Sequence, residues 1–166
     1  MRRPAGPPPR ADAPFLFREM TIEDLDRVME IELEAFAHPW SAELFRRELG
    51  HAWSTILIAG EARPAAEARR APVLGFVIYW LVHDELHVLN VAVAPEERRR
   101  GVARALLEEM TQRGRLAGAV LATLEVRRSN RPAIALYESL GYRQVGVRPN
   151  YYVDEGEDAI IMNADL

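Results

Sequence analysis

The chain has 166 residues, a formal net charge of −4 and no cysteine. This length fits one domain with a proper core, and the mild negative charge gives no reason to expect direct nucleic-acid binding. The lack of cysteine excludes disulfides, thiolate metal ligands and a cysteine nucleophile. All 21 basic residues are arginine, which excludes a Schiff-base lysine. The histidines are His38, His51, His83 and His87. His83 and His87 are four residues apart, but across a turn and a strand rather than along a helix, so we expect no metal site.

Residues 1–14 are rich in Pro, Ala and Arg, which predicts a disordered tail, and residues 15–166 are expected to form the folded domain. No apolar run approaches the length that spans a bilayer, and the N-terminus lacks the apolar core of a signal peptide. We therefore expect a cytoplasmic protein that does not bind membranes. The sequence leaves the oligomeric state open, with a monomer favoured.

Two helices are predicted in the first third of the chain. Thr21, with the Asp24 carboxylate three residues on, can cap the first. The residues expected on and around its apolar stripe are Leu25, Val28, Met29, Ile31, Leu33 and Phe36. Pro39 ends that helix, and Ser41 can cap the second.

Two further helices alternate with strands in the rest of the chain. One begins after Gly101 and is expected to end at Gly114 and Gly118; the other runs from Asn130, its cap, to Leu140. Residues 60–72 form a polar excursion, expected to be an exposed loop. The order of elements predicts a mixed α/β domain with helices on both faces of the sheet. The expected strands are residues 15–18, 53–59, 73–82, 86–93, 120–127, 142–147 and 159–163.

The turn after the strand 86–93 combines positive charge with a glycine. Arg98, Arg99, Arg100 and Gly101 precede the helix, whose first N–H groups lack internal partners and attract anions. The glycines of a nucleotide P-loop and of a dinucleotide-binding turn are both absent. The turn is therefore interpreted either as a phosphate cradle or as a solvated arginine run before an amphipathic helix.

Glu125 is a carboxylate inside an apolar strand. By the two-residue period of a strand, it shares a face with Leu121 and Thr123. Such a carboxylate is costly unless it is paired or wet. Two interpretations stand side by side: a functional base, or a glutamate in a salt bridge to Arg127 or Arg128.

Tyr137 is predicted to point inward from its helix, because it lies three residues after Ile134 and three before Leu140. An inward tyrosine needs a partner for its hydroxyl. It is either a core residue or a functional acid.

These features together resemble the GNAT acetyltransferases, and within them the RimI group of bacterial ribosomal-protein-alanine N-acetyltransferases. The resemblance spans residue 15 to the C-terminus. Ala103 is a small departure, since many members have Gly there. The motifs are Arg98-x-x-Gly101-x-Ala103, Leu124-Glu125-Val126-Arg127, Asn130-x-x-Ala133-x-x-Leu136-Tyr137-Glu138-x-x-Gly141-Tyr142, Phe36-Ala37-His38-Pro39-Trp40-Ser41 and Arg148-Pro149-Asn150-Tyr151-Tyr152.

The resemblance implies the GNAT fold, with a central mixed, mostly antiparallel sheet, and acetyl-CoA as co-substrate without a metal. It implies Glu125 as general base and Tyr137 as general acid, with Trp40 and Tyr151 at the acceptor. Residues implied to bind acetyl-CoA are Val91, Ala92 and Val93 where the sheet opens, Arg99, Arg100, Gly101, Val102, Ala103 and Arg104 at the pyrophosphate, and Asn130.

The resemblance further implies that the acceptor is a protein N-terminus, in the first place the N-terminal alanine of the eighteenth small-subunit ribosomal protein. Acidic residues between Asp154 and Asp158 could attract a basic ribosomal tail, or could simply be a solvated loop. The alternatives are a GNAT enzyme for a small-molecule amine or an internal lysine, and a non-catalytic acyl-CoA-binding module.

Overall fold

The computed structural model describes residues 15–64, 66–68 and 71–166, so the predicted tail lies outside the described residues. The described part contains a seven-stranded sheet in the order β1-β2-β3-β4-β5-β7-β6. All neighbouring strands pair antiparallel except β4 and β5, which run parallel. The predicted mixed, mostly antiparallel sheet is confirmed. The strands are β1 (Phe15–Glu19), β2 (Ser54–Glu61), β3 (Val73–Val82), β4 (Glu85–Val93), β5 (Leu121–Arg127), β6 (Arg143–Tyr152) and β7 (Glu157–Asp165).

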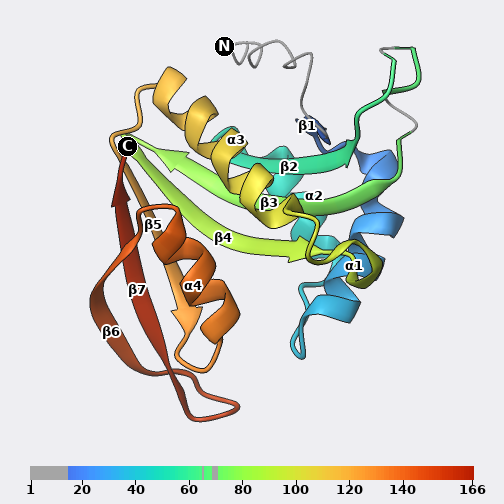
Figure 1. The fold of residues 1–166 in the computed structure, drawn as a ribbon. Coiled ribbons are helices and arrows are strands. Elements are labelled where there is room, and N and C mark those ends of the chain that lie inside the picture. Colours follow the sequence, from blue (N-terminus) through green and yellow to red (C-terminus); the bar gives the residue numbers. More distant parts are fainter. Residues whose placement is uncertain (1–14, 65, 69–70) are drawn as a thin grey trace.

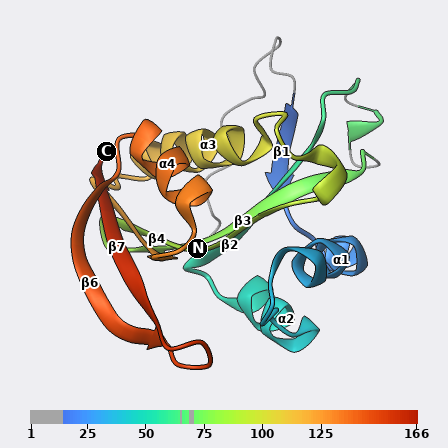
Figure 2. The same cartoon turned by 60° about the horizontal axis from the view of Figure 1, so that its bottom comes forward.

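Helices cover both faces of the sheet, as predicted. Figure 2 shows α3 and α4 on one side and α1 and α2 on the other. Each pair of helices closes its own hydrophobic cluster against the strands. No helix within the described residues is long and apolar enough to cross a membrane. The helices are α1 (Leu25–Ala35), α2 (Ala42–Gly50), α3 (Val102–Leu116) and α4 (Arg131–Ser139).

Side-chain caps begin two of the helices where the sequence predicts them. The Ser41 hydroxyl accepts from the Leu44 N–H at 3.3 Å, and Asn130 Oδ1 accepts from the Ala133 N–H at 3.3 Å. At the first helix the Asp24 carboxylate accepts from the Thr21 N–H at 2.9 Å, but it closes a short 3₁₀ turn ahead of α1.

Two details of the predicted helices are wrong. Leu33 is 59% exposed, whereas its neighbour Glu32 is completely buried. Gly114 does not end α3 but lies inside it, buried, where an added Cβ would come within 2.4 Å of Leu86 Cδ1. The helix needs a glycine there to approach β4 closely, and it is Gly118, at φ +93°, that follows its end.

A β-bulge in β4 changes which side chains face each layer. Ile78 pairs with Asn90 and Tyr79 with Val88, so Leu89 is the extra residue. Val88 and Val91, on either side of the bulge, both pack toward the α3 and α4 layer. The bulge therefore turns Asn90 toward α1, which the sequence pattern alone does not predict.

Candidate active site

The pairing between β4 and β5 ends about halfway along the two strands. They pair only where Glu85–Val88 meets Leu121–Leu124, although β4 continues to Val93 and β5 to Arg127. Figure 1 shows the two strands diverging from this paired end. Beyond Val88, one edge of β4 is therefore open, as the sequence resemblance implied for the binding of acetyl-CoA.

The open edge presents backbone N–H groups. The Ala94 N–H donates to the Leu74 carbonyl of β3 at 2.9 Å. Because main-chain groups alternate in direction along a strand, the Ala92 main chain also faces β3, and those of Val91 and Val93 face the open edge. Of the three residues predicted to bind acetyl-CoA in β4, only Val91 and Val93 present free backbone groups there.

The N-terminus of α3 is open and carries the partial positive charge of the helix dipole. Its N-cap is Gly101, at φ +83°, a conformation that favours glycine, and among the described residues no side chain caps the helix. An added Cβ on Gly101 would meet no described atom within 4 Å. The first N–H groups of α3, those of Val102, Ala103 and Arg104, are therefore available to a phosphate.

The arginines of this turn differ in their partners. Arg100 contacts Glu97 and lies 3.5 Å from Glu61, so its charge is already matched. Arg104 donates to the Ser139 hydroxyl at 2.6 Å and so ties α3 to α4. Arg98 and Arg99 are both exposed and form no ion pair in the described part of the chain, so their charges remain unmatched there.

Glu125 lies on the face of β5 opposite α4, because its neighbours Leu124 and Val126 are buried in the α3 and α4 layer. Its Oε1 is 2.9 Å from Arg148 Nε. Interaction with the same carboxylate, followed by burial, raises the pKa of Tyr151, so the phenol lies close to Glu125. The structure thus brings Glu125 and Tyr151 together.

The predicted salt-bridge partners of Glu125 were wrong. Arg127 contacts Glu155 and lies over the Tyr152 ring, 3.9 Å from its centroid. Arg128 pairs with Asp158 at 3.1 Å.

Tyr137 lies on the other face of the sheet. Its ring packs against the α3 and α4 cluster, with its centroid 5.7 Å from that of Tyr142. Burial raises the pKa of Tyr137 to about 12, with a smaller contribution from Tyr152. The phenol therefore keeps its proton throughout the neutral range, where it has a proton to donate.

Trp40 lies in the loop between α1 and α2, and its ring packs on Phe45 with centroids 5.9 Å apart. The backbone N–H of Trp40 donates to the side chain of Glu32, a buried residue that was not among the predicted site residues. The signal was present: Glu32 follows Val28 by four residues and so shares its buried helical face.

The acidic residues between Asp154 and Asp158 are mostly engaged. Glu155 contacts Arg127 and lies 3.2 Å from His38 Nε2, and Glu157 accepts from the Ser129 N–H at 2.7 Å. Since Arg127 and Arg128 offset part of their charge, these acids are weaker candidates for steering a basic tail than the sequence suggested. No three His, Asp or Glu side chains of the described residues gather as a metal site.

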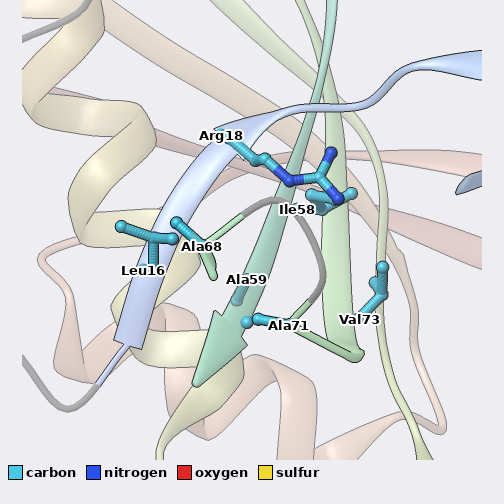
Figure 3. Close-up of a pocket in the computed structure, with 8 residues that line it drawn as sticks. Leu16, Arg18, Ile58, Ala59, Ala68, Ala71 and Val73 are labelled. Carbon is cyan, nitrogen blue, oxygen red and sulfur yellow. The ribbon is translucent and has the colours of Figure 1, made fainter. Parts of the chain in front are cut away.

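A shallow pocket lies elsewhere, at the edge formed by β1 and β2 (Figure 3). Its one charged side chain, Arg18, is held by two 2.7 Å hydrogen bonds to Asp24. None of the predicted site residues lines it, so it is not the candidate active site. Its lining residues are Leu16, Arg18, Ile58, Ala59, Gly60, Ala68, Ala71 and Val73.

Comparisons with known proteins agree with this geometry. The acetyltransferase (GNAT) family model matches residues 25–142. The [ribosomal protein bS18]-alanine N-acetyltransferase of Salmonella typhimurium is 39% identical over 86% of this chain and 92% of its own length. The Escherichia coli protein of the same name is 40% identical over 84% and 89%. The crystal structure of the E. coli ribosomal-protein-S18-alanine N-acetyltransferase superposes with a TM-score of 0.79 at 35% identity, covering 91% of this chain and 93% of that one.

Proposed function

Because the chain belongs to the acetyltransferase (GNAT) family, we propose that it transfers the acetyl group of acetyl-CoA to the N-terminal alanine of ribosomal protein bS18. The observation that carries this proposal is the identity of 39–40%, over at least 84% of the chain, to proteins with that activity. The acceptor is a cytoplasmic ribosomal protein, so we place the reaction in the cytoplasm.

The open edge of β4 and the N-terminus of α3 would hold acetyl-CoA, which supplies an activated thioester. The uncapped N–H groups after Gly101 and the unpaired Arg99 suit its pyrophosphate. The N–H groups of Val91 and Val93 suit its extended arm and the thioester carbonyl, where a donor stabilises developing negative charge. Asn130, whose Oδ1 caps α4, is the proposed contact of the cofactor at that helix.

Glu125 would take the proton of the attacking amine, and Tyr137 would give one to the departing thiolate. An α-amine has a pKa near 8, so its neutral form costs roughly 1.4 kcal/mol at pH 7, whereas a lysine side chain costs roughly 4.6 kcal/mol. One carboxylate is adequate for the first task. With no cysteine in the chain, direct attack by the amine replaces an acetyl-cysteine route.

The acceptor would lie on the Glu125 side of the sheet. Tyr151 lies near that carboxylate, which raises its pKa, and it is 46% exposed, so its ring can contact an incoming N-terminus. Trp40, in the loop after α1, is proposed as a second wall of the same slot. Bulky aromatic walls beside the base favour a small first residue such as alanine.

A peptide panel tests the proposal. Peptides with the bS18 N-terminal sequence and Ala, Ser, Met or Glu in first place are incubated with acetyl-CoA, together with an N-blocked peptide that contains lysine. The alanine peptide should have the highest kcat/KM, with the acetyl group mapped to its α-amine by mass spectrometry. Equal rates for all first residues, or acetylation of the lysine, would contradict the proposed acceptor.

A further inference from the structure

Glu32 joins three parts of the molecule that are distant in sequence. It lies on α1 with its side chain fully buried. Its Oε1 accepts from the backbone N–H of Trp40 at 2.8 Å, and its Oε2 accepts from the side-chain amide of Asn90 at 2.9 Å. One carboxylate therefore ties α1 both to the loop that carries Trp40 and to the bulge of β4.

Both anchored segments border the candidate active site. Asn90 is the residue directly before Val91, whose N–H faces the open edge of β4. Trp40 belongs to the proposed acceptor slot. Asn90 is also the first residue after the extra Leu89, so its bond to Glu32 fixes the direction of the strand where the bulge changes it.

Burying the Glu32 carboxylate here has a larger free-energy cost than burying an apolar side chain. Both its partners are neutral, and burial raises the pKa of Glu32 despite the two donors that favour its charged form. Well-packed apolar side chains are often as stable as buried ionic groups, or more stable. A glutamate here therefore supplies what an apolar side chain lacks, which is two directed acceptors for two different segments.

We infer that Glu32 is a positioning residue. It fixes the loop between α1 and α2, which carries Trp40 and is called the acceptor loop below, relative to β4, which carries the Val91 N–H. This inference rests on the proposed acetyl transfer. The Trp40 bond positions the acceptor, so its loss raises the acceptor KM. The Asn90 bond positions the Val91 N–H, so its loss lowers kcat. The phosphate cradle at Gly101 is separate from both contacts.

Glu48 provides a matched control. It is a second buried glutamate, 8% exposed, whose Oε2 accepts from Trp80 Nε1 at 2.8 Å. It ties α2 to β3, and within the described residues its carboxylate forms no hydrogen bond to β4 or to the acceptor loop. Glu48→Met therefore removes a buried carboxylate and leaves a neutral donor unpaired, but it keeps both hydrogen bonds of Glu32.

The experiment compares Glu32→Met, Glu32→Gln, Asn90→Ala and Glu48→Met in the full chain, with any acceptor that the wild type acetylates. It measures kcat, acceptor KM and the Kd of CoA, at a temperature where circular dichroism shows each variant folded. A wild type inactive on all acceptors would refute the proposed function, whereas the inference is judged only on ratios to an active wild type.

Glu32→Met should raise the acceptor KM and lower kcat, reducing kcat/KM by at least about tenfold. It should weaken CoA binding by no more than roughly threefold, because the Gly101 cradle stays intact and CoA lacks the thioester carbonyl that the Val91 N–H would polarise. Glu32→Gln should recover most of the loss, because its oxygen can accept from Trp40 while Asn90 turns its amide to accept from the new NH₂. Glu48→Met should keep both kinetic constants within about twofold.

Asn90→Ala decides the matter if Glu32→Met does not fold. It removes only the contact to β4, so kcat should fall with the acceptor KM nearly unchanged. Wild-type kcat in folded Asn90→Ala would overturn the inference. Equal losses in Glu32→Met and Glu48→Met, no rescue in Glu32→Gln, or a parallel loss of CoA affinity would overturn it as well.

Discussion

Glu125 and Tyr137 lie on opposite faces of the sheet, on either side of the place where β4 and β5 separate. Glu125 faces away from α4 with Arg148 and Tyr151, whereas Tyr137 is packed within the α3 and α4 layer. A base and an acid that both touched the same side of a bound thioester would compete for space. With Glu125 as the proposed base and Tyr137 as the proposed acid, this separation would let the amine approach from one side and the thiolate leave toward the other.

Tyr137→Phe should lower kcat by about a hundredfold or more, because it removes the proton donor for the leaving thiolate. The effect should persist at high pH, since deprotonating the amine does not replace that donor. Steady-state rates with the alanine peptide measure it. Tyr142→Phe is the matched control: the Tyr142 hydroxyl is buried without a hydrogen-bond partner among the described residues, so kcat should stay near the wild-type value. A similar loss in both variants would make Tyr137 a packing residue.

The wild-type pH profile should have no falling limb between pH 7 and 10. Burial raises the pKa of Tyr137 to about 12, so the phenol stays protonated across this range. Deprotonation of the amine meanwhile helps the reaction. kcat measured in a series of overlapping buffers should therefore rise or stay level. A fall near pH 9 that disappears in Tyr137→Phe would contradict the assignment.

Gly101→Val should raise the KM for acetyl-CoA at least about tenfold, because its Cβ would occupy the open space beside the first N–H groups of α3. The substitution also forces a branched residue into φ +83°, which alone costs about 1 kcal/mol or more. Gly118→Val reproduces that strain at the far end of α3, at φ +93°. If Gly118→Val raises the KM as much, backbone strain rather than the cradle explains the result.

Gly114→Ala should destabilise the fold by about 1–2 kcal/mol, because the new methyl would collide with Leu86, which is fully buried and must shift within a packed core. Urea unfolding followed by circular dichroism measures the change. Gly50→Ala, where an added Cβ meets no described atom within 4 Å, should leave stability unchanged or slightly higher. Equal stabilities for the two variants would show that α3 and β4 can separate at little cost.

Local rules predict much of the fold. Ser41 and Asn130 cap helices because a short polar side chain reaches the free N–H groups, and this depends only on neighbours three residues away. The alternation along β5 places Glu125 on the opposite face from Leu124 for the same reason. The inward orientation of the Tyr137 side chain follows from its three-residue spacing to Ile134.

The rest depends on contacts between distant segments. The bulge at Leu89 is set by the pairing of β3 with β4, and one extra residue reverses the pattern that periodicity predicts. The partner of Glu125 is Arg148 on β6. The strand order β5-β7-β6, which the sequence does not reveal, brings the two side chains within reach across β7. The spacing of Glu32 to Val28 places it on a buried face, but its partner Asn90 is 58 residues away. No local pattern identifies that partner.

The pH dependence of Glu125→Gln tests the base most directly. Glutamine keeps the shape of the side chain but cannot take a proton from the amine. At pH 7 kcat should fall by about a hundredfold or more, and the ratio to the wild type should recover by up to about tenfold by pH 9, as an α-amine with a pKa near 8 loses its proton unaided.

Arg148→Met, compared in the same kcat measurement, breaks the same ion pair from its exposed side and leaves the carboxylate in place. Since such pairs contribute at most about 1 kcal/mol, kcat should stay within about fivefold of the wild type, with an unchanged pH profile. A large loss in Glu125→Gln that recovers with pH, with little change in Arg148→Met, is the predicted result. Equal, pH-independent effects of the two substitutions would show that Glu125 is only the salt-bridge partner of Arg148.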